Sequence, residues 1–141
     1  MPSSLEVRVS ECIFCRIVAG TERSWKVYET PHIYAFLDTN PLSEYHTLVV
    51  PKRHYINVFD VAPDAWLELM AAVKAVVDRF RERLGVEHVQ IVNNSGGAAD
   101  QQVFHLHIHV IPRGTGGAQQ VTWSPRPELR ERFDAMLAEL S

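Results

Sequence analysis

The chain has 141 residues, of which 46% are hydrophobic and 22% are charged, and its formal net charge is −3 at pH 7. This length and composition predict one globular domain whose hydrophobic core needs no disulfides. The small negative charge argues against binding to long nucleic acids, while local donors can still hold a mononucleotide. No apolar run is long enough to span a membrane and the first ten residues lack a signal-peptide core, so we expect a cytoplasmic protein.

The first part of the chain combines a polar segment with a short helical pattern. Residues 1–10 are predicted to form a flexible arm, and residues 11–141 are predicted to form a single domain. Gly20 is typical of a helix end, and four apolar residues before it recur at helical spacing: Ile13, Phe14, Ile17 and Val18. We therefore expect one or two turns of helix in this segment.

Cys12 and Cys15 lie in this segment with C-x2-C spacing and admit three interpretations. They could form a redox pair, although the βαβ pattern of thioredoxin-like proteins is missing around them. They could be two buried cysteines that fill core positions. They could also be half of a tetrahedral zinc site that two histidines complete.

Four segments after this helix have the composition of β-strands. Residues 25–29 and 33–38 are rich in aromatic and β-branched residues and are separated by a turn. Residues 46–51 and 88–93 have a similar composition. With the histidine-rich segment described below, they make five predicted strands.

A long helix is predicted between the third and fourth of these strands. Pro63 suits the first helical position and Gly85 lies just past the last one. The helix carries one apolar stripe: Trp66, Leu69, Met70, Val73, Val76, Val77, Phe80 and Leu84. A final amphipathic helix is predicted over residues 127–140, with an apolar side made of Leu129, Phe133, Met136, Leu137 and Leu140. These elements predict an α+β domain whose helices cover one face of the sheet.

The most informative segment runs over residues 104–110, where polar and apolar residues alternate strictly. This period of two predicts a half-buried strand that ends near Pro112. One face carries His105, His107 and His109, and the other places four side chains in the core: Phe104, Leu106, Ile108 and Val110. Neutral imidazoles at this spacing can act on one small ligand as nucleophile, proton donor or metal ligand. A catalytic zinc or iron site is one alternative, and a solvated strand face is another.

Small residues fill the loop before this strand, over residues 94–100. They allow the backbone to approach a ligand closely, but the Gly-Lys-Ser/Thr ending of a P-loop is missing. The loop is therefore either an ordinary turn or a segment that faces a phosphate.

Several motifs occur together in one order along residues 12–113: the segments 36–41 and 46–54, Asn94-Ser95-Gly96, Gln101-Gln102-Val103, the three histidines and Ile111-Pro112-Arg113. In this order they resemble the histidine triad family of nucleotide hydrolases and transferases. Tyr45 and Asp100 depart from the pattern, because the family usually has glycine at both positions. A carboxylate repels phosphates, so Asp100 should either point away or make the pocket less tolerant of anionic charge.

The resemblance implies both a fold and a reaction. The implied fold is a five-stranded antiparallel sheet with one long helix and shorter terminal helices, paired with a second copy in a symmetric homodimer. The implied reaction is attack by His107 on the α-phosphorus of a nucleoside 5′-phosphate derivative, followed by hydrolysis of a covalent nucleotidyl-histidine. His109 hydrogen-bonds phosphate oxygens in this scheme, and His105 has a positional role. No catalytic cofactor is required. A nucleotide sensor without catalytic activity is the remaining alternative.

The resemblance also implies which residues bind a small purine nucleotide. The nucleoside pocket is formed by Phe36, Asp38 and Thr39. Asp38 accepts hydrogen bonds from ribose hydroxyls there, or simply starts the turn before Asn40. The ribose and phosphate oxygens are contacted by Asn94, Gln101, Gln102 and Val103.

Two further residues have open roles under this resemblance. His46 either orients a triad ring or is a structural histidine. Arg113 reaches a distal phosphate, caps the end of the strand or lies in solvent. The substrate class stays open among nucleoside phosphoramidates, aminoacyl-adenylate-like compounds and diadenosine polyphosphates.

The same resemblance implies a structural zinc ion that pins the N-terminal segment to the sheet. Its ligands would be Cys12, Cys15, His54 and His105, the last being the first histidine of the triad.

Overall fold

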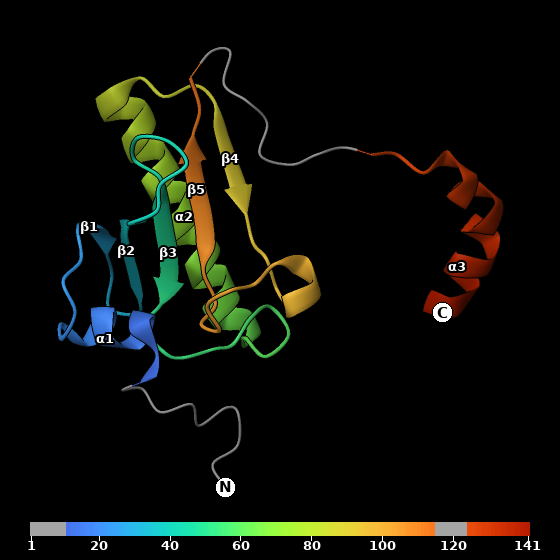
Figure 1. The fold of residues 1–141 in the computed structure, drawn as a ribbon, viewed down its shortest axis with the longest axis horizontal. Helices are drawn as coiled ribbons and strands as arrows, with labels where there is room; N and C mark the ends of the chain where they lie inside the picture. Colours follow the sequence, from blue (N-terminus) through green and yellow to red (C-terminus); the bar gives the residue numbers. More distant parts are fainter. Residues whose placement is uncertain (1–10, 115–123) are drawn as a thin grey trace, which may run out of the picture.

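The computed structural model describes residues 11–114 and 124–141 (Figure 1). The arm predicted over residues 1–10 lies outside these described residues. One antiparallel sheet has the strand order β1-β2-β3-β5-β4, with bounds β1 Lys26–Glu29, β2 Ile33–Leu37, β3 Thr47–Pro51, β4 Val89–Val92 and β5 Ile108–Pro112. The predicted α+β class and five-stranded antiparallel sheet are therefore confirmed.

The helices of the described residues are α1 Ile13–Ala19, α2 Pro63–Leu84, α3 Phe133–Leu140 and two short 3-10 helices, η3 Gly97–Ala99 and η4 Pro127–Arg132. α1 and α2 end as predicted at glycines in the left-handed conformation, Gly20 with φ 80° and Gly85 with φ 68°. The helix predicted over residues 127–140 is divided into η4 and α3. Within the described part of the chain, no helix combines the length and the apolar character that crossing a membrane requires.

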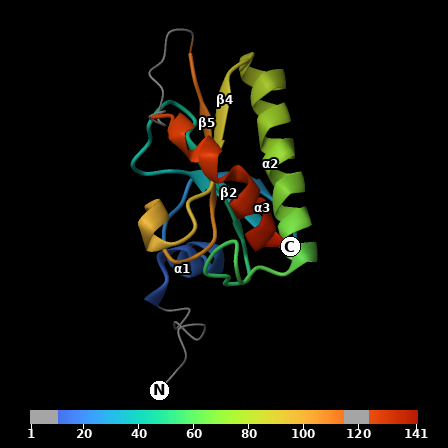
Figure 2. The same ribbon diagram turned by 90° about the vertical axis from the view of Figure 1, so that its right-hand side faces the viewer.

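The main hydrophobic core lies between α2 and one face of the sheet (Figure 2). The predicted stripe of α2 supplies Leu69, Val73, Val76 and Phe80, and the sheet side supplies Ile33, Ala35, Val49, Leu106, Ile108 and Val110. Leu84 is an exception to the predicted stripe, because this last residue of the helix is 43% exposed.

A second, smaller cluster lies on the opposite face of the sheet, against α1. Its buried members are Cys12, Phe14, Cys15, Phe36, Leu48 and Val50. Along β3, Leu48 and Val50 point to this cluster whereas Val49 points to α2, so both faces of the strand are buried. The prediction named one face covered by helices; in the structure α1 also lies against the other face, where consecutive apolar residues bury β3 on both sides.

The histidine-rich segment becomes a strand later than its sequence pattern predicts. β5 pairs with β3 only from Ile108 onward, and the backbone N–H of Leu106 donates instead to the carbonyl of Tyr55 at 2.7 Å. The alternation of faces still holds through Leu106, which is fully buried in the main core. Phe104 does not follow it: its side chain is 52% exposed, so its predicted place in the core was wrong.

Two residues other than glycine have positive φ in the described chain, Tyr45 with φ 64° and Asp100 with φ 66°. These are the two positions at which the sequence departs from the family's glycines. A left-handed conformation costs an L-residue roughly 1–2 kcal/mol relative to glycine's freedom. The backbone conformation therefore explains why glycine is usual there.

α3 lies apart from the sheet (Figure 1). Its predicted apolar side is present but exposed in the described structure, at Phe133, Met136, Leu137 and Leu140.

Candidate active site and metal centre

A cavity of about 690 Å³ opens beside α1, β2, β3 and the segment that leads into β5. This volume falls within the range typical of small-molecule sites. Most of the residues that the sequence predicts to bind the nucleotide line it: Phe36, Asp38, Thr39, Asn94, Gln102, Val103, His107 and His109.

Gln101 is the predicted nucleotide-binding residue that does not belong to this lining. Its side chain is only 5% exposed and is held by four hydrogen bonds within the protein. The amide nitrogen donates to the carbonyls of Ile56 (2.7 Å) and Val103 (3.0 Å), while the amide oxygen accepts from the N–H of Gly96 (2.8 Å) and from Asn57 Nδ2 (3.2 Å). Gln101 therefore braces the loop before the triad, and its predicted contact with the nucleotide is not what this geometry supports.

His107 has a defined proton position. Its Nδ1 lies 2.7 Å from the backbone carbonyl of His105, which can only accept a hydrogen bond. Nδ1 therefore carries the proton, and Nε2 keeps its lone pair. Burial lowers the pKa of His107 below its ordinary value, so the ring is neutral at pH 7. His107 is thus a neutral imidazole with one unprotonated nitrogen at the cavity wall.

A chain of hydrogen bonds sets the proton position of His109 as well. The backbone N–H of Leu42 donates to Nδ1 of His46 at 2.9 Å, so the proton of His46 resides on Nε2. That Nε2–H donates to Nδ1 of His109 at 2.9 Å. The remaining nitrogen of His109, Nε2, therefore carries a proton and is a hydrogen-bond donor. His46 is 2% exposed and is the partner that orients a triad ring, one of its two predicted roles.

Burial is also the main influence on the protonation of these two rings. Burial, together with the neighbouring rings of His107 and His46, lowers the pKa of His109 to about 4. Burial lowers the pKa of His46 too, and the Asp38 carboxylate, 3.5 Å from its Nε2, acts in the opposite direction. Both rings are therefore neutral at pH 7, as the hydrogen-bond chain requires.

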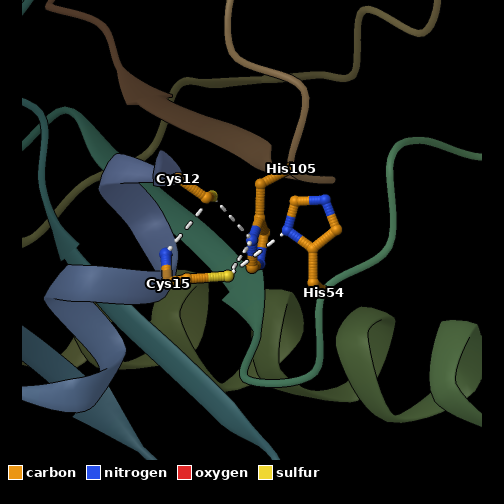
Figure 3. Close-up of side chains that lie close together, drawn as sticks. All are labelled: Cys12, Cys15, His54 and His105. Atoms are coloured by element: carbon orange, nitrogen blue, oxygen red, sulfur yellow. Dashed lines mark hydrogen bonds between the residues drawn. The ribbon is translucent and has the colours of Figure 1, made fainter. Parts of the chain in front are cut away.

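His105 turns away from this cavity toward the two cysteines (Figure 3). Its Nε2–H donates to the carbonyl of Pro51 at 2.8 Å, which leaves the lone pair of Nδ1 facing Cys12 Sγ at 3.4 Å and Cys15 Sγ at 3.5 Å. His54 Nδ1 lies 3.3 Å from Cys15 Sγ. These four predicted metal ligands come from the start of α1, the segment after β3 and the segment before β5.

The four ligand atoms fit a tetrahedral zinc ion. All of them lie within 4.8 Å of one another, and three sulfur–nitrogen separations among them are 3.3 to 3.5 Å. Zinc bonds of about 2.3 Å to sulfur and about 2.0 Å to nitrogen give tetrahedral sulfur–nitrogen edges of about 3.5 Å. Burial and the neighbouring Cys12 together raise the pKa of the Cys15 thiol to about 12, so thiolates here need a neighbouring cation. This geometry favours the metal interpretation of the cysteine pair over the other two.

The three triad rings do not converge on one point, which weighs against the metalloenzyme alternative. Among the described residues, the groups able to hold a metal are the Cys/His cluster and a group of Asp38, His46 and His109. In the second group, Nε2 of His46 carries a proton because its Nδ1 accepts from Leu42. A metal there would have to displace that proton and break the hydrogen-bond chain.

Sequence reasoning missed the contribution of α1 to the cavity. Ile13, Phe14 and Ile17 line the cavity, although their helical spacing predicted only a packed face. The Phe14 ring meets the rings of His105, His107 and Phe36 edge to face, with centroids 5.9, 5.1 and 5.5 Å away. No pattern in the sequence separates an apolar residue that fills a core from one that walls a ligand cavity.

Asp100 is one of the residues that line the cavity. Its carboxylate accepts a hydrogen bond from Gln102 Nε2 at 3.4 Å. The effect of this carboxylate on anionic ligands stays a prediction.

Comparisons with known proteins agree with this site. The family described as the HIT domain matches residues 20–116 of the chain. The chain is 40% identical over 134 residues to Protein hit of Bacillus subtilis, covering 91% of this chain and 92% of that protein. It is 36% identical over 104 residues to the adenylylsulfatase HINT3 of Arabidopsis thaliana, covering 74% of this chain and 53% of that protein.

A solved structure supports the same relationship. A zinc-bound histidine triad family protein from Mycobacterium smegmatis superimposes with a TM-score of 0.75 at 34% sequence identity, covering 93% of this chain and 96% of that one. The motifs, the fold and these matches lead to one conclusion: the chain belongs to the HIT, or histidine triad, family.

Proposed function

We propose that this protein hydrolyses nucleoside 5′-phosphate derivatives at the α-phosphorus through a covalent nucleotide on His107. The observation that carries the proposal is the pair of opposite tautomers in one cavity. His107 keeps a lone pair on Nε2, and His109 keeps a proton on Nε2. A nucleophile and a donor are therefore available side by side, with ring centroids 5.1 Å apart.

The reaction has two displacement steps. In the first, the lone pair of His107 Nε2 forms a bond to the α-phosphorus, and the leaving group departs with the electron pair of its broken bond. In the second, a water oxygen bonds to phosphorus, the phosphorus–nitrogen bond breaks, and its electron pair returns to Nε2. The proton that water loses passes to the solvent or to the departed group. The products are a nucleoside monophosphate and the free leaving group.

The surrounding residues support the charges that develop in these steps. His107 becomes cationic when Nε2 is phosphorylated, and its Nδ1–H stays on the carbonyl of His105. The Asp38 carboxylate favours the positive charge on this ring. In this proposal the Nε2–H of His109 donates to phosphate oxygens as they gain charge.

The nucleotide would lie with its base toward α1. Ile17, Phe14 and Phe36 offer an apolar wall, and Asp38 and Thr39 follow directly along the chain for the ribose. Asn94, Gln102 and Val103 line the side from which the triad enters and would contact the phosphate. The leaving group would be an amine, as in a phosphoramidate, or a second phosphate chain, as in a dinucleoside polyphosphate. The adenylylsulfatase name of the Arabidopsis relative indicates a mixed anhydride as a third candidate.

The direct test compares His107→Ala with His32→Ala, a matched change at an exposed histidine that does not line the cavity. Purified proteins are assayed for AMP release from an adenosine phosphoramidate, a diadenosine polyphosphate and adenylyl sulfate. We expect His107→Ala to abolish AMP release while AMP still binds, and His32→Ala to match the unchanged protein. Radiolabelled nucleotide trapped on His107 by acid quench supports the covalent step. Turnover that survives in His107→Ala would refute it, and binding without turnover in the unchanged protein would favour a nucleotide sensor.

We also propose that Cys12, Cys15, His54 and His105 hold a structural zinc ion. The fit of the four ligand atoms to a tetrahedron supports this proposal, and so does the zinc-bound relative from Mycobacterium smegmatis. The zinc ion would have a structural role, because it would tie α1 to the sheet. The proposed reaction needs no step on the metal. Elemental analysis of protein purified without chelators should give one zinc per chain.

A homodimer is the assembly we propose. β4 lies at one edge of the sheet, with Ile91 exposed, and the apolar side of α3 is exposed as well. Both features suit burial against a second copy. Light scattering during size-exclusion chromatography should give twice the 16.0 kDa mass of one chain.

A further inference from the structure

Arg113 closes the triad motif, but its guanidinium does not line the cavity. Its Nε donates to Oε1 of Gln90 in β4 at 2.8 Å, and its Nη1 donates to the carbonyl oxygen of Leu42 at 3.3 Å. The side chain therefore joins the far edge of the sheet to the segment between β2 and β3. Of the three roles open from the sequence, contact with a distal phosphate has no support in this geometry.

Leu42 is the residue through which Arg113 reaches the active site. Its carbonyl accepts from Arg113, and its N–H donates to Nδ1 of His46. These two groups flank a single Cα, so a clamp on the carbonyl restrains the direction of the N–H. The side chain of Leu42 is 51% exposed, so burial holds this residue only in part.

We propose that Arg113 is a positioning residue that fixes the tautomer of His109 through Leu42 and His46. The inference rests on the proposed function for its consequence, because His109 is the donor to the phosphate. Its physical content is independent of that function. With the Leu42 N–H held on Nδ1 of His46, the proton of His46 stays on Nε2. Nδ1 of His109 must then accept from His46 Nε2, so His109 carries its own proton on Nε2 and donates from that atom.

The charge of Arg113 acts in the same direction as its hydrogen bond. Burial has the largest effect on His46 and lowers its pKa, Asp38 raises it, and Arg113 lowers it. A cation near His46 thus favours the neutral ring. Only a neutral ring can accept from Leu42 at Nδ1 while it donates to His109.

The test replaces Arg113 by methionine, which keeps an unbranched apolar stem but removes the guanidinium group and its charge. Arg113→Lys keeps the charge and loses the two-pronged reach, and Arg83→Met, on the exposed side of α2, is the matched control. The readout is the ring nitrogen NMR signals of His46 and His109 without nucleotide, assigned from His46→Gln and His109→Gln. Steady-state kinetics on the adenosine phosphoramidate follow.

In the unchanged protein and in Arg83→Met, we expect both rings to carry the proton on Nε2. In Arg113→Met the rings of His46 and His109 should show mixed tautomers. In the same variant kcat should fall about tenfold while KM stays nearly unchanged. A tenfold loss corresponds to one charge-assisted hydrogen bond made in the transition state. Arg113→Lys should give an intermediate tautomer shift, which keeps the test valid if the methionine variant folds poorly. Unchanged tautomers in both variants, or a His46 proton on Nδ1 in the unchanged protein, would overturn the inference. If the unchanged protein shows no turnover, the proposed function fails, while the tautomer signals still decide the role of Arg113.

Discussion

Replacing Gln101 by leucine separates the two roles that this side chain could have. The structure gives Gln101 four hydrogen bonds inside the protein and no place on the cavity wall. Leucine has nearly the same volume but offers no donor or acceptor. Each lost bond contributes about 0.5–1.5 kcal/mol, so the free energy of unfolding should fall by about 2–4 kcal/mol once partial access of water is allowed for.

The assay is urea unfolding without nucleotide, followed by fluorescence, with Gln102→Leu as the matched control. Gln102 lies next along the chain, lines the cavity and is exposed, so its loss should leave the free energy of unfolding within about 0.5 kcal/mol. Gln102→Leu should instead weaken AMP binding. The reasoning is refuted if Gln101→Leu keeps the stability of the unchanged protein while its affinity for AMP collapses, because that is the behaviour of a nucleotide contact.

Three other predictions follow from the site. Asp100→Asn removes a negative charge from the cavity while keeping a residue that tolerates positive φ. KM for a diadenosine polyphosphate should therefore fall about threefold at low salt and by less at high salt. An unchanged KM would mean that the carboxylate does not act on phosphates. Removing metal with a strong chelator should lower Tm by about 10 °C, and so should the substitution Cys15→Ser. Added zinc should restore Tm in the chelated protein but not in the variant. Chelation without effect on Tm would contradict a structural metal. Burial lowers the pKa of His109 from 6.5 to about 4, so protonation favours the unfolded chain, and stability should decline as the pH falls from 6.5 toward 4. His109→Asn should weaken this decline in urea unfolding measured at a series of pH values, whereas an unaltered slope would assign it to other groups.

Local signals in the sequence predicted most of the elements well. Pro63 and Gly85 marked both ends of α2, and the alternation around Leu106 and Ile108 predicted which side of the triad segment is buried. These signals work because a missing N–H, a left-handed turn and a period of two are properties of a few neighbouring residues. The grouping of two cysteines with His54 and His105 came from the family resemblance, and the structure brings those four side chains together.

The remaining features depend on contacts between residues that lie far apart in the sequence, which local patterns do not predict. β5 begins at Ile108, opposite Val49, although β3 continues to Pro51, and the carbonyl of Tyr55 takes the N–H of Leu106 instead. Gln101 and Gln102 are chemically identical neighbours, and only the position of Ile56 and Gly96 decides which of them is buried. The role of Leu42 could not be predicted, because its backbone rather than its side chain contacts His46.

The Phe14 ring contacts the rings of His105 and His107 from α1, and Cys12 and Cys15 at the start of this helix belong to the proposed zinc site. The Phe14 side chain therefore lies between the proposed zinc site and the proposed active site and contacts a histidine of each. Loss of either cysteine would therefore be expected to loosen α1 and, with it, the aromatic ring that lies against His107, the proposed nucleophile.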